Sequence, residues 1–128
     1  MLIKDPIPIL QKAVKKNKAI AAFNVYNMEM IQAVISGARK EKAPVIIQTT
    51  PGTLEYAGPE MIAAMVKKEV EKNEVNVILH LDHCSSYQQI VSAIRAGYSS
   101  VMYDGSHLKY EDNIAQTSEV VKVARAAG

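Results

Sequence analysis

The amino-acid sequence predicts an α/β protein with a parallel β-sheet, and three observations support this prediction. Four short segments of alternating polarity begin near residues 19, 45, 75 and 99, and each is followed by a segment of helical periodicity. This spacing is typical of βαβ units of roughly 30 residues, whose right-handed crossovers make neighbouring strands parallel. Polar side chains also gather at the carboxyl ends of the predicted strands, where α/β enzymes carry their catalytic groups.

The composition indicates one globular core and excludes several classes of protein. The chain has 128 residues, 48% hydrophobic and 22% charged, with a formal net charge of +2. No basic run is long enough to indicate a nucleic acid or an anionic membrane as partner. No apolar stretch reaches membrane-spanning length or resembles a signal peptide. The single cysteine, Cys84, excludes an internal disulfide framework and fits a reducing compartment. We therefore predict a cytoplasmic protein, and no linker or second domain interrupts the pattern.

The first half of the chain holds two of the four strand–helix units. In chain order we expect a helix over 6–17, a strand over 19–25, a helix over 28–42, a strand over 45–50 and a long helix from about residue 59. Pro44 blocks continuation of one helix, and Pro59 suits the first turn of the next. Thr50-Pro51-Gly52-Thr53 is expected to be a loop. The apolar stripe of the opening helix is Ile9, Leu10, Ala13 and Val14, and that of the long helix is Met61, Ile62, Met65, Val66 and Val70.

The second half is organised around a predicted buried strand, Val75 to Cys84, in which an acid and an imidazole stand side by side near the carboxyl end. A helix over about 86–96 follows, with Gly97 as its C-terminal cap. The fourth strand is expected over 99–104. A loop then leads to a helix over about 110–126, which has two acidic residues in its first turn, where the helix dipole favours them.

The polar residues near the strand ends share one phase of the alternation. They are Asn24, Gln48, Thr50, His80, Asp82 and Asp104. In a parallel barrel this phase is the interior, and its carboxyl rim is the mouth of the site. Two carboxylates left unpaired in a core would be costly, so we predict that Asp82 and Asp104 face one cup.

Two histidines beside this cup and one beyond it are further candidates. Asp82 can carry a proton and His83 can bind a metal. The alternative is that both merely cap the turn into the next helix. His80, deeper in the strand, is more typical of a hydrogen-bonded interior histidine than of a ligand, and His107 lies in the loop after the fourth strand.

Five segments taken together resemble one enzyme family. They are Ala22-Phe23-Asn24-Val25, Ala43-Pro44-Val45-Ile46-Ile47, Thr50-Pro51-Gly52-Thr53, His80-Leu81-Asp82-His83 and Ser100-Val101-Met102-Tyr103-Asp104-Gly105-Ser106-His107. The chain resembles the amino-terminal half of class II ketose-bisphosphate aldolases. These are zinc-dependent enzymes that cleave fructose 1,6-bisphosphate or tagatose 1,6-bisphosphate. The resemblance implies a TIM (β/α)8 barrel, of which residues 1–128 would form about the first four β/α units, as the amino-terminal half of one domain.

The resemblance also implies roles for individual residues. Asp82 resembles the proton donor/acceptor of the family, and His83 resembles its first zinc ligand. Asp104 resembles a carboxylate that holds a second divalent metal position, while Thr50 and Asn24 resemble substrate-binding residues. Zinc would stabilise the enediolate formed when the C3–C4 bond breaks to give dihydroxyacetone phosphate and glyceraldehyde 3-phosphate. The implied partners are a phosphorylated sugar, a monovalent cation and further copies in a dimer or tetramer.

The sequence leaves the choice between the two substrates open. The Thr50–Thr53 loop with Ala57-Gly58 is similar to tagatose-type members, whereas Ser85-Ser86 and Tyr87 are similar to fructose-type members. A Schiff-base aldolase would need a lysine inside the rim, and no predicted strand offers one; Lys109 lies beyond the loop.

The length raises an alternative to the enzyme. A family barrel has roughly 250 residues or more, and of three expected zinc ligands only His83 is present. Residues 1–128 are therefore expected to be inactive in isolation. The alternative is a catalytically silent half-barrel that self-associates, because two sheet edges and an apolar interior would be left open.

Overall fold

Four parallel strands form one sheet in which the strand order follows the chain, β1-β2-β3-β4. The computed structural model describes all residues, 1–128. The strands are β1 (Ala21–Asn24), β2 (Val45–Thr49), β3 (Val77–Cys84) and β4 (Ser100–Tyr103). A doubly wound sheet reverses its strand order at a switch point, whereas a (β/α)8 barrel does not. The sequential order is therefore that of part of a barrel, as predicted.

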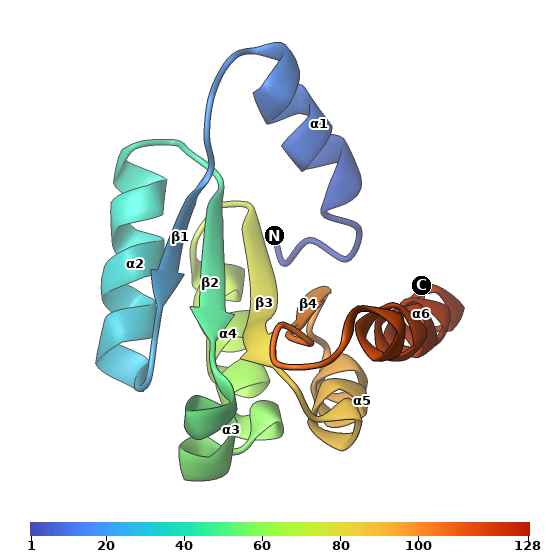
Figure 1. Cartoon of the computed structure of the whole chain (residues 1–128). Coiled ribbons are helices and arrows are strands. Elements are labelled where there is room, and N and C mark those ends of the chain that lie inside the picture. The colour runs from blue at the N-terminus through green and yellow to red at the C-terminus, as the bar shows by residue number, and fades with distance from the viewer.

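Six helices accompany the strands. They are α1 (Ile7–Lys15), α2 (Met28–Lys40), α3 (Pro51–Ala57), α4 (Pro59–Lys72), α5 (Tyr87–Ala96) and α6 (Tyr110–Ala126). The core lies between one face of the sheet and α2, α4 and α5. Its largest fully buried side chains include Ile35 of α2, Ile62 of α4, Ile90 of α5, and Ile47 and Leu79 of the sheet. The opposite face of the sheet is not covered by these helices (Figure 1).

Several predicted boundaries are confirmed by the local chemistry that predicted them. The last helix spans 110–126 in both the prediction and the structure. The Ser86 hydroxyl caps α5 by accepting from the Gln89 N–H at 3.3 Å. Gly97 ends α5 in the left-handed conformation, at φ 105°, which glycine adopts without strain.

Three expectations about the helices are wrong. Residues 51–53 are not a loop but the first turn of α3, because Pro51 is pre-organised for that position and Thr50 is already extended before it. The opening helix buries no residue, and Val14 is 73% exposed, because α1 lies beyond the amino ends of the strands rather than against the sheet (Figure 1). Met61 is 59% exposed, so the buried stripe of α4 begins only at Ile62.

The first three residues extend the sheet in a way that the sequence pattern does not show. Leu2 forms a parallel bridge with Val77. The Ile3 N–H donates to the Val77 carbonyl at 2.8 Å, and the Val77 N–H donates to the Met1 carbonyl at 3.0 Å. The amino terminus itself donates to the Val75 carbonyl. This segment therefore pairs with the β3 edge at Val77, before the point where β4 begins to pair with β3.

A search of the helices for a membrane-spanning segment finds none with the required length and hydropathy.

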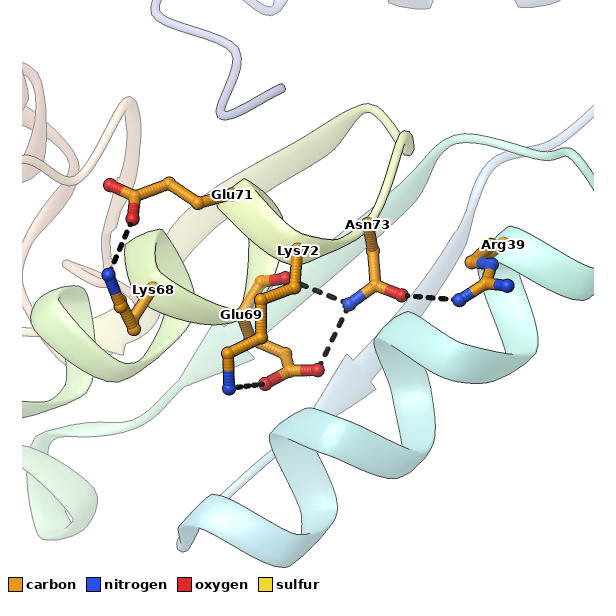
Figure 2. A network of polar contacts seen from close by, with 6 residues as sticks. All are labelled: Arg39, Lys68, Glu69, Glu71, Lys72 and Asn73. Carbon is orange, nitrogen blue, oxygen red and sulfur yellow. Dashed lines mark hydrogen bonds and ion pairs between the residues drawn. The ribbon is translucent and has the colours of Figure 1, made fainter.

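A polar network on the outer surface joins the ends of α2 and α4 (Figure 2). Arg39 donates to the Asn73 side-chain oxygen at 3.2 Å, and the Asn73 amide donates to the Glu69 carbonyl at 2.9 Å and to its carboxylate at 3.0 Å. Lys72 lies 3.6 Å from Glu69, and Lys68 lies 3.1 Å from Glu71. Exposed ion pairs contribute at most about 1 kcal/mol each, so the network mainly fixes the chain as it leaves α4.

Candidate active site

Four polar side chains lie in one row across the sheet, at the same register level. Asn24 pairs with Gln48, Gln48 pairs with His80, and His80 pairs with Ser100. Their neighbours in sequence, such as Ile47 and Leu79, are buried against the helices, so the row belongs to the opposite face. Two residues further along the strands, Thr50 and Asp82 have the same phase. The predicted polar face therefore exists on all four strands.

Asp82 is held by a neighbouring strand. The Gln48 Nε2 donates to Asp82 Oδ2 at 2.9 Å. The other oxygen, Oδ1, lies 3.7 Å from His80 Nε2 and 3.9 Å from His83 Nε2, and the Asp82 side chain is 17% exposed. Both distances are too long for a hydrogen bond. One carboxylate oxygen is thus fixed by an amide, while the other faces two imidazoles.

A β-bulge brings His83 to Asp104. Between the pairs Leu81–Val101 and Cys84–Tyr103 the register shifts, so that Asp82 and His83 of β3 oppose a single residue of β4. Two residues opposite one define a bulge. His83 sits in the left-handed region, at φ 51°. Its Nδ1 lies 2.9 Å from Asp104 Oδ2.

The bulge interrupts the alternation of β3 after Asp82, within a strand that runs on to Cys84. A regular strand would send His83 into the core together with Leu81. His83 is instead 60% exposed, and Cys84 is fully buried in the core cluster. No glycine or proline in His80-Leu81-Asp82-His83 signals the bulge, so periodicity could not find it.

The charges of the site follow from these contacts. Hydrogen bonds from Ser106 and His83 hold the pKa of Asp104 well below its ordinary value; the backbone N–H of Ser106 donates at 3.1 Å. The hydrogen bond to Asp104, followed by the charge of Asp82, raises the pKa of His83. Burial lowers the pKa of His80, against the opposing effect of the Asp82 charge. Asp104 therefore accepts a hydrogen bond from the Nδ1–H of His83. The other ring nitrogen of His83, Nε2, faces the Asp82 carboxylate.

The donors fit zinc in type but not in number. An imidazole nitrogen and carboxylate oxygens are ordinary zinc ligands. No group of three or more His, Cys, Asp or Glu side chains is arranged to hold a metal ion in this chain, however. His83 and Asp104 alone would not complete a zinc site, so any metal held there would need ligands from outside these residues.

The remaining predicted residues form no hydrogen bond or ion pair with Asp82, His83 or Asp104. Thr50 is half-buried at the start of α3 and makes no capping hydrogen bond through its side chain. Asn24 is exposed at the end of β1, and His107 is exposed in the loop after β4. The sequence pattern places Gln48 on the correct face and Ser106 in the last of the five segments, but it assigns neither residue a role.

Comparison with known proteins decides the family. The family model described as fructose-bisphosphate aldolase class-II matches residues 5–128. The chain belongs to the class II fructose-bisphosphate aldolase family. This confirms the family that the sequence segments predict.

Relatives within this family cover the whole chain. A fructose-bisphosphate aldolase from Helicobacter pylori is 41% identical over 129 residues, which are 100% of this chain and 42% of that protein. One from Thermus caldophilus is 39% identical over 122 residues, which are 95% of this chain and 40% of that protein. The chain therefore spans less than half the length of these relatives.

Solved structures agree with the barrel fold. The YdjI aldolase from Escherichia coli K12 matches with a TM-score of 0.90 and 36% identity, covering 98% of this chain and 49% of that one. Fructose-bisphosphate aldolase from Campylobacter jejuni matches with a TM-score of 0.82 and 28% identity, covering 91% of this chain and 42% of that one.

Proposed function

We propose that residues 1–128 form the amino-terminal half of a single aldolase barrel domain that cleaves a ketose 1,6-bisphosphate. The products would be dihydroxyacetone phosphate and glyceraldehyde 3-phosphate. The names of the relatives favour fructose 1,6-bisphosphate over tagatose 1,6-bisphosphate as substrate. The predicted location is the cytoplasm, where a lone thiol such as Cys84 stays reduced, and the predicted assembly is a homodimer or homotetramer.

The observation that carries this proposal is the placement of Asp82. Its carboxylate is anchored through Oδ2, and Oδ1 makes no hydrogen bond with the protein. A free carboxylate oxygen at the carboxyl rim of a parallel sheet is suited to general acid/base catalysis. In our proposal Asp82 takes the C4 hydroxyl proton during cleavage and returns it during condensation.

His83 and Asp104 are the proposed metal-binding residues. Asp104 fixes the orientation of the His83 ring through Nδ1 and leaves Nε2 as the nitrogen available to a metal, an arrangement common around metal-binding histidines. Bound zinc would supply Lewis-acid polarisation of the substrate oxygens. Asn24 and Thr50, at the ends of β1 and β2 on the same face, are the proposed substrate-binding residues of this chain.

One observation favours a second candidate for residues 1–128 taken alone, a self-associating half-barrel without activity. All four residues of the edge strand β1 are exposed, and Phe23 is 49% exposed. Unpaired, partly apolar sheet edges are templates for association.

A single comparison tests both candidates. The full-length product of the gene and purified 1–128 would each be assayed with fructose 1,6-bisphosphate and tagatose 1,6-bisphosphate, before and after chelation of metal, and their masses in solution measured. We expect chelator-sensitive cleavage by the full-length protein and an inactive, oligomeric 1–128. A zinc-loaded full-length protein that cleaves neither substrate would overturn the proposed function, and a monomeric 1–128 would overturn self-association.

A further inference from the structure

We propose that Gln48 is a positioning residue that holds the Asp82 carboxylate so that Oδ1 is the oxygen that exchanges the proton with substrate. This inference rests on the proposed role of Asp82 as the general acid/base. It assigns a function to a side chain that the sequence placed on the correct face without giving it a role.

The two oxygens of Asp82 have different surroundings. Oδ2 accepts a hydrogen bond from Gln48 Nε2 at 2.9 Å, across from the neighbouring strand. Oδ1 has no hydrogen-bond donor from the protein, because His80 Nε2 and His83 Nε2 stand 3.7 and 3.9 Å away. The Asp82 side chain is 17% exposed, and Oδ1 is its oxygen without a donor, so Oδ1 is the oxygen left for a substrate hydroxyl.

An amide is chemically suited to this task. A cationic partner would stabilise a carboxylate in its charged form and weaken it as a base. The neutral amide of Gln48 donates one hydrogen bond, cannot take the proton itself and leaves the charge in place. Gln48 can therefore fix the orientation of Asp82 without replacing it in proton transfer.

The residues two positions before Asp82 in register are Gln48, His80 and Ser100, and His80 lies on the Oδ1 side of the carboxylate. His80 lies next to Gln48 in register, and its Nδ1 is 2.8 Å from the Ser100 hydroxyl on β4. This contact fixes the His80 ring, and the ring stands below Oδ1 at a distance that excludes a hydrogen bond. Gln48, His80 and Ser100 thus lie side by side on three adjacent strands, and Gln48 supplies the one hydrogen bond among them that reaches Asp82.

The test is the variant Gln48→Met, which keeps the length of the side chain but removes the donor, with Gln48→Leu as a second variant. Displacing a reacting group by about 1 Å can cost about 100-fold in rate. We expect kcat for ketose-bisphosphate cleavage by the full-length protein to fall about 10- to 100-fold, with KM changing less than about threefold. Gln32→Met, on the exposed surface of α2, is the matched control and should leave kcat unchanged.

A double-mutant cycle separates positioning from a purely structural role. In an Asp82→Asn background, Gln48→Met should lower the residual kcat less than about twofold, because its effect acts only through the Asp82 carboxylate. Losses that multiply, or a KM that rises while kcat is kept, would overturn the proposal in favour of a structural or a direct substrate role.

A crystal structure of the Gln48→Met protein gives a readout that does not depend on activity. We expect the Asp82 carboxylate to turn away from its present orientation. An unmoved carboxylate would overturn the positioning role even in a protein with no aldolase activity, whereas inactivity of the wild type would overturn only the proposed function.

Discussion

Replacing Asp82 with asparagine tests the centre of the proposed site. An asparagine side chain has nearly the same shape and keeps an oxygen that can accept from Gln48, but it cannot carry the proton. General acid/base catalysis contributes about 10²- to 10⁴-fold, which corresponds to about 2.7 to 5.4 kcal/mol of the activation barrier. We expect kcat for fructose 1,6-bisphosphate cleavage by the full-length Asp82→Asn protein to fall by this factor. Zinc content, measured by atomic absorption, should stay near that of the wild type because Asp82 is not a proposed ligand.

The control for this prediction is Asp112→Asn. It removes the same charge from an exposed residue in the first turn of α6 that forms no hydrogen bond or ion pair with the site, and should change kcat less than about twofold. A full-length Asp82→Asn protein that keeps more than about half of its kcat would refute the assignment of Asp82 as the proton carrier. Loss of zinc in that variant would instead make Asp82 a ligand.

Three further predictions address the metal, a helix cap and a buried phenol. His83→Ala should remove both zinc and activity from the full-length protein, because a catalytic zinc is held poorly by two protein ligands; full zinc occupancy by metal analysis would show that His83 is no ligand. Gly97→Ala should lower the free energy of unfolding by about 1 kcal/mol, because Gly97 has φ +105°. Gly37→Ala in α2, where nothing lies within 4 Å of the added carbon, should raise the free energy of unfolding by about 0.5–1 kcal/mol. Urea unfolding measures both changes, and equal shifts would contradict the argument. Burial raises the pKa of Tyr98 to about 12, above the value of about 10 in an unfolded chain. Its contribution to stability is therefore complete below pH 10 and lost between pH 10 and 12. Unfolding free energies at both ends of this interval should fall less in Tyr98→Phe than in the wild type, and an identical fall would refute the effect.

The parts of the fold that the sequence predicts are those with local causes. Gly97 ends α5 because it adopts a left-handed conformation, and Pro59 begins α4 because its φ is already helical. The strand order follows from short right-handed connections, which need no knowledge of distant contacts. The exposure of Val14 in α1, by contrast, depends on where that helix lies relative to the sheet, and an apolar stripe alone does not contain this information.

In the candidate site, too, the sequence predicts the features with local causes and misses the contacts between strands. The phase of the strands places Gln48, His80 and Asp82 on one face, because alternation is a property of each strand taken separately. The hydrogen bond from Gln48 to Asp82 could not be predicted, because it depends on the length and direction of a side chain that crosses between strands. The contact between His83 and Asp104 was hidden for a further reason, which is that it requires the alternation to fail.

That failure is what allows two consecutive residues of one strand to serve one site. In a regular strand Asp82 and His83 would point to opposite faces, one into the cup and one into the helix-covered core. The bulge gives His83 a left-handed backbone, at φ 51°, which costs a non-glycine residue about 1–2 kcal/mol. Strain of this kind persists only where the surrounding structure enforces it. Here the hydrogen bond to Asp104 and the return of Cys84 to the core do so, on either side of the strained residue. The strained backbone therefore lies where the proposed function needs it. It turns the His83 side chain toward Asp104, which binds Nδ1 of the imidazole, and leaves Nε2 beside the carboxylate of Asp82.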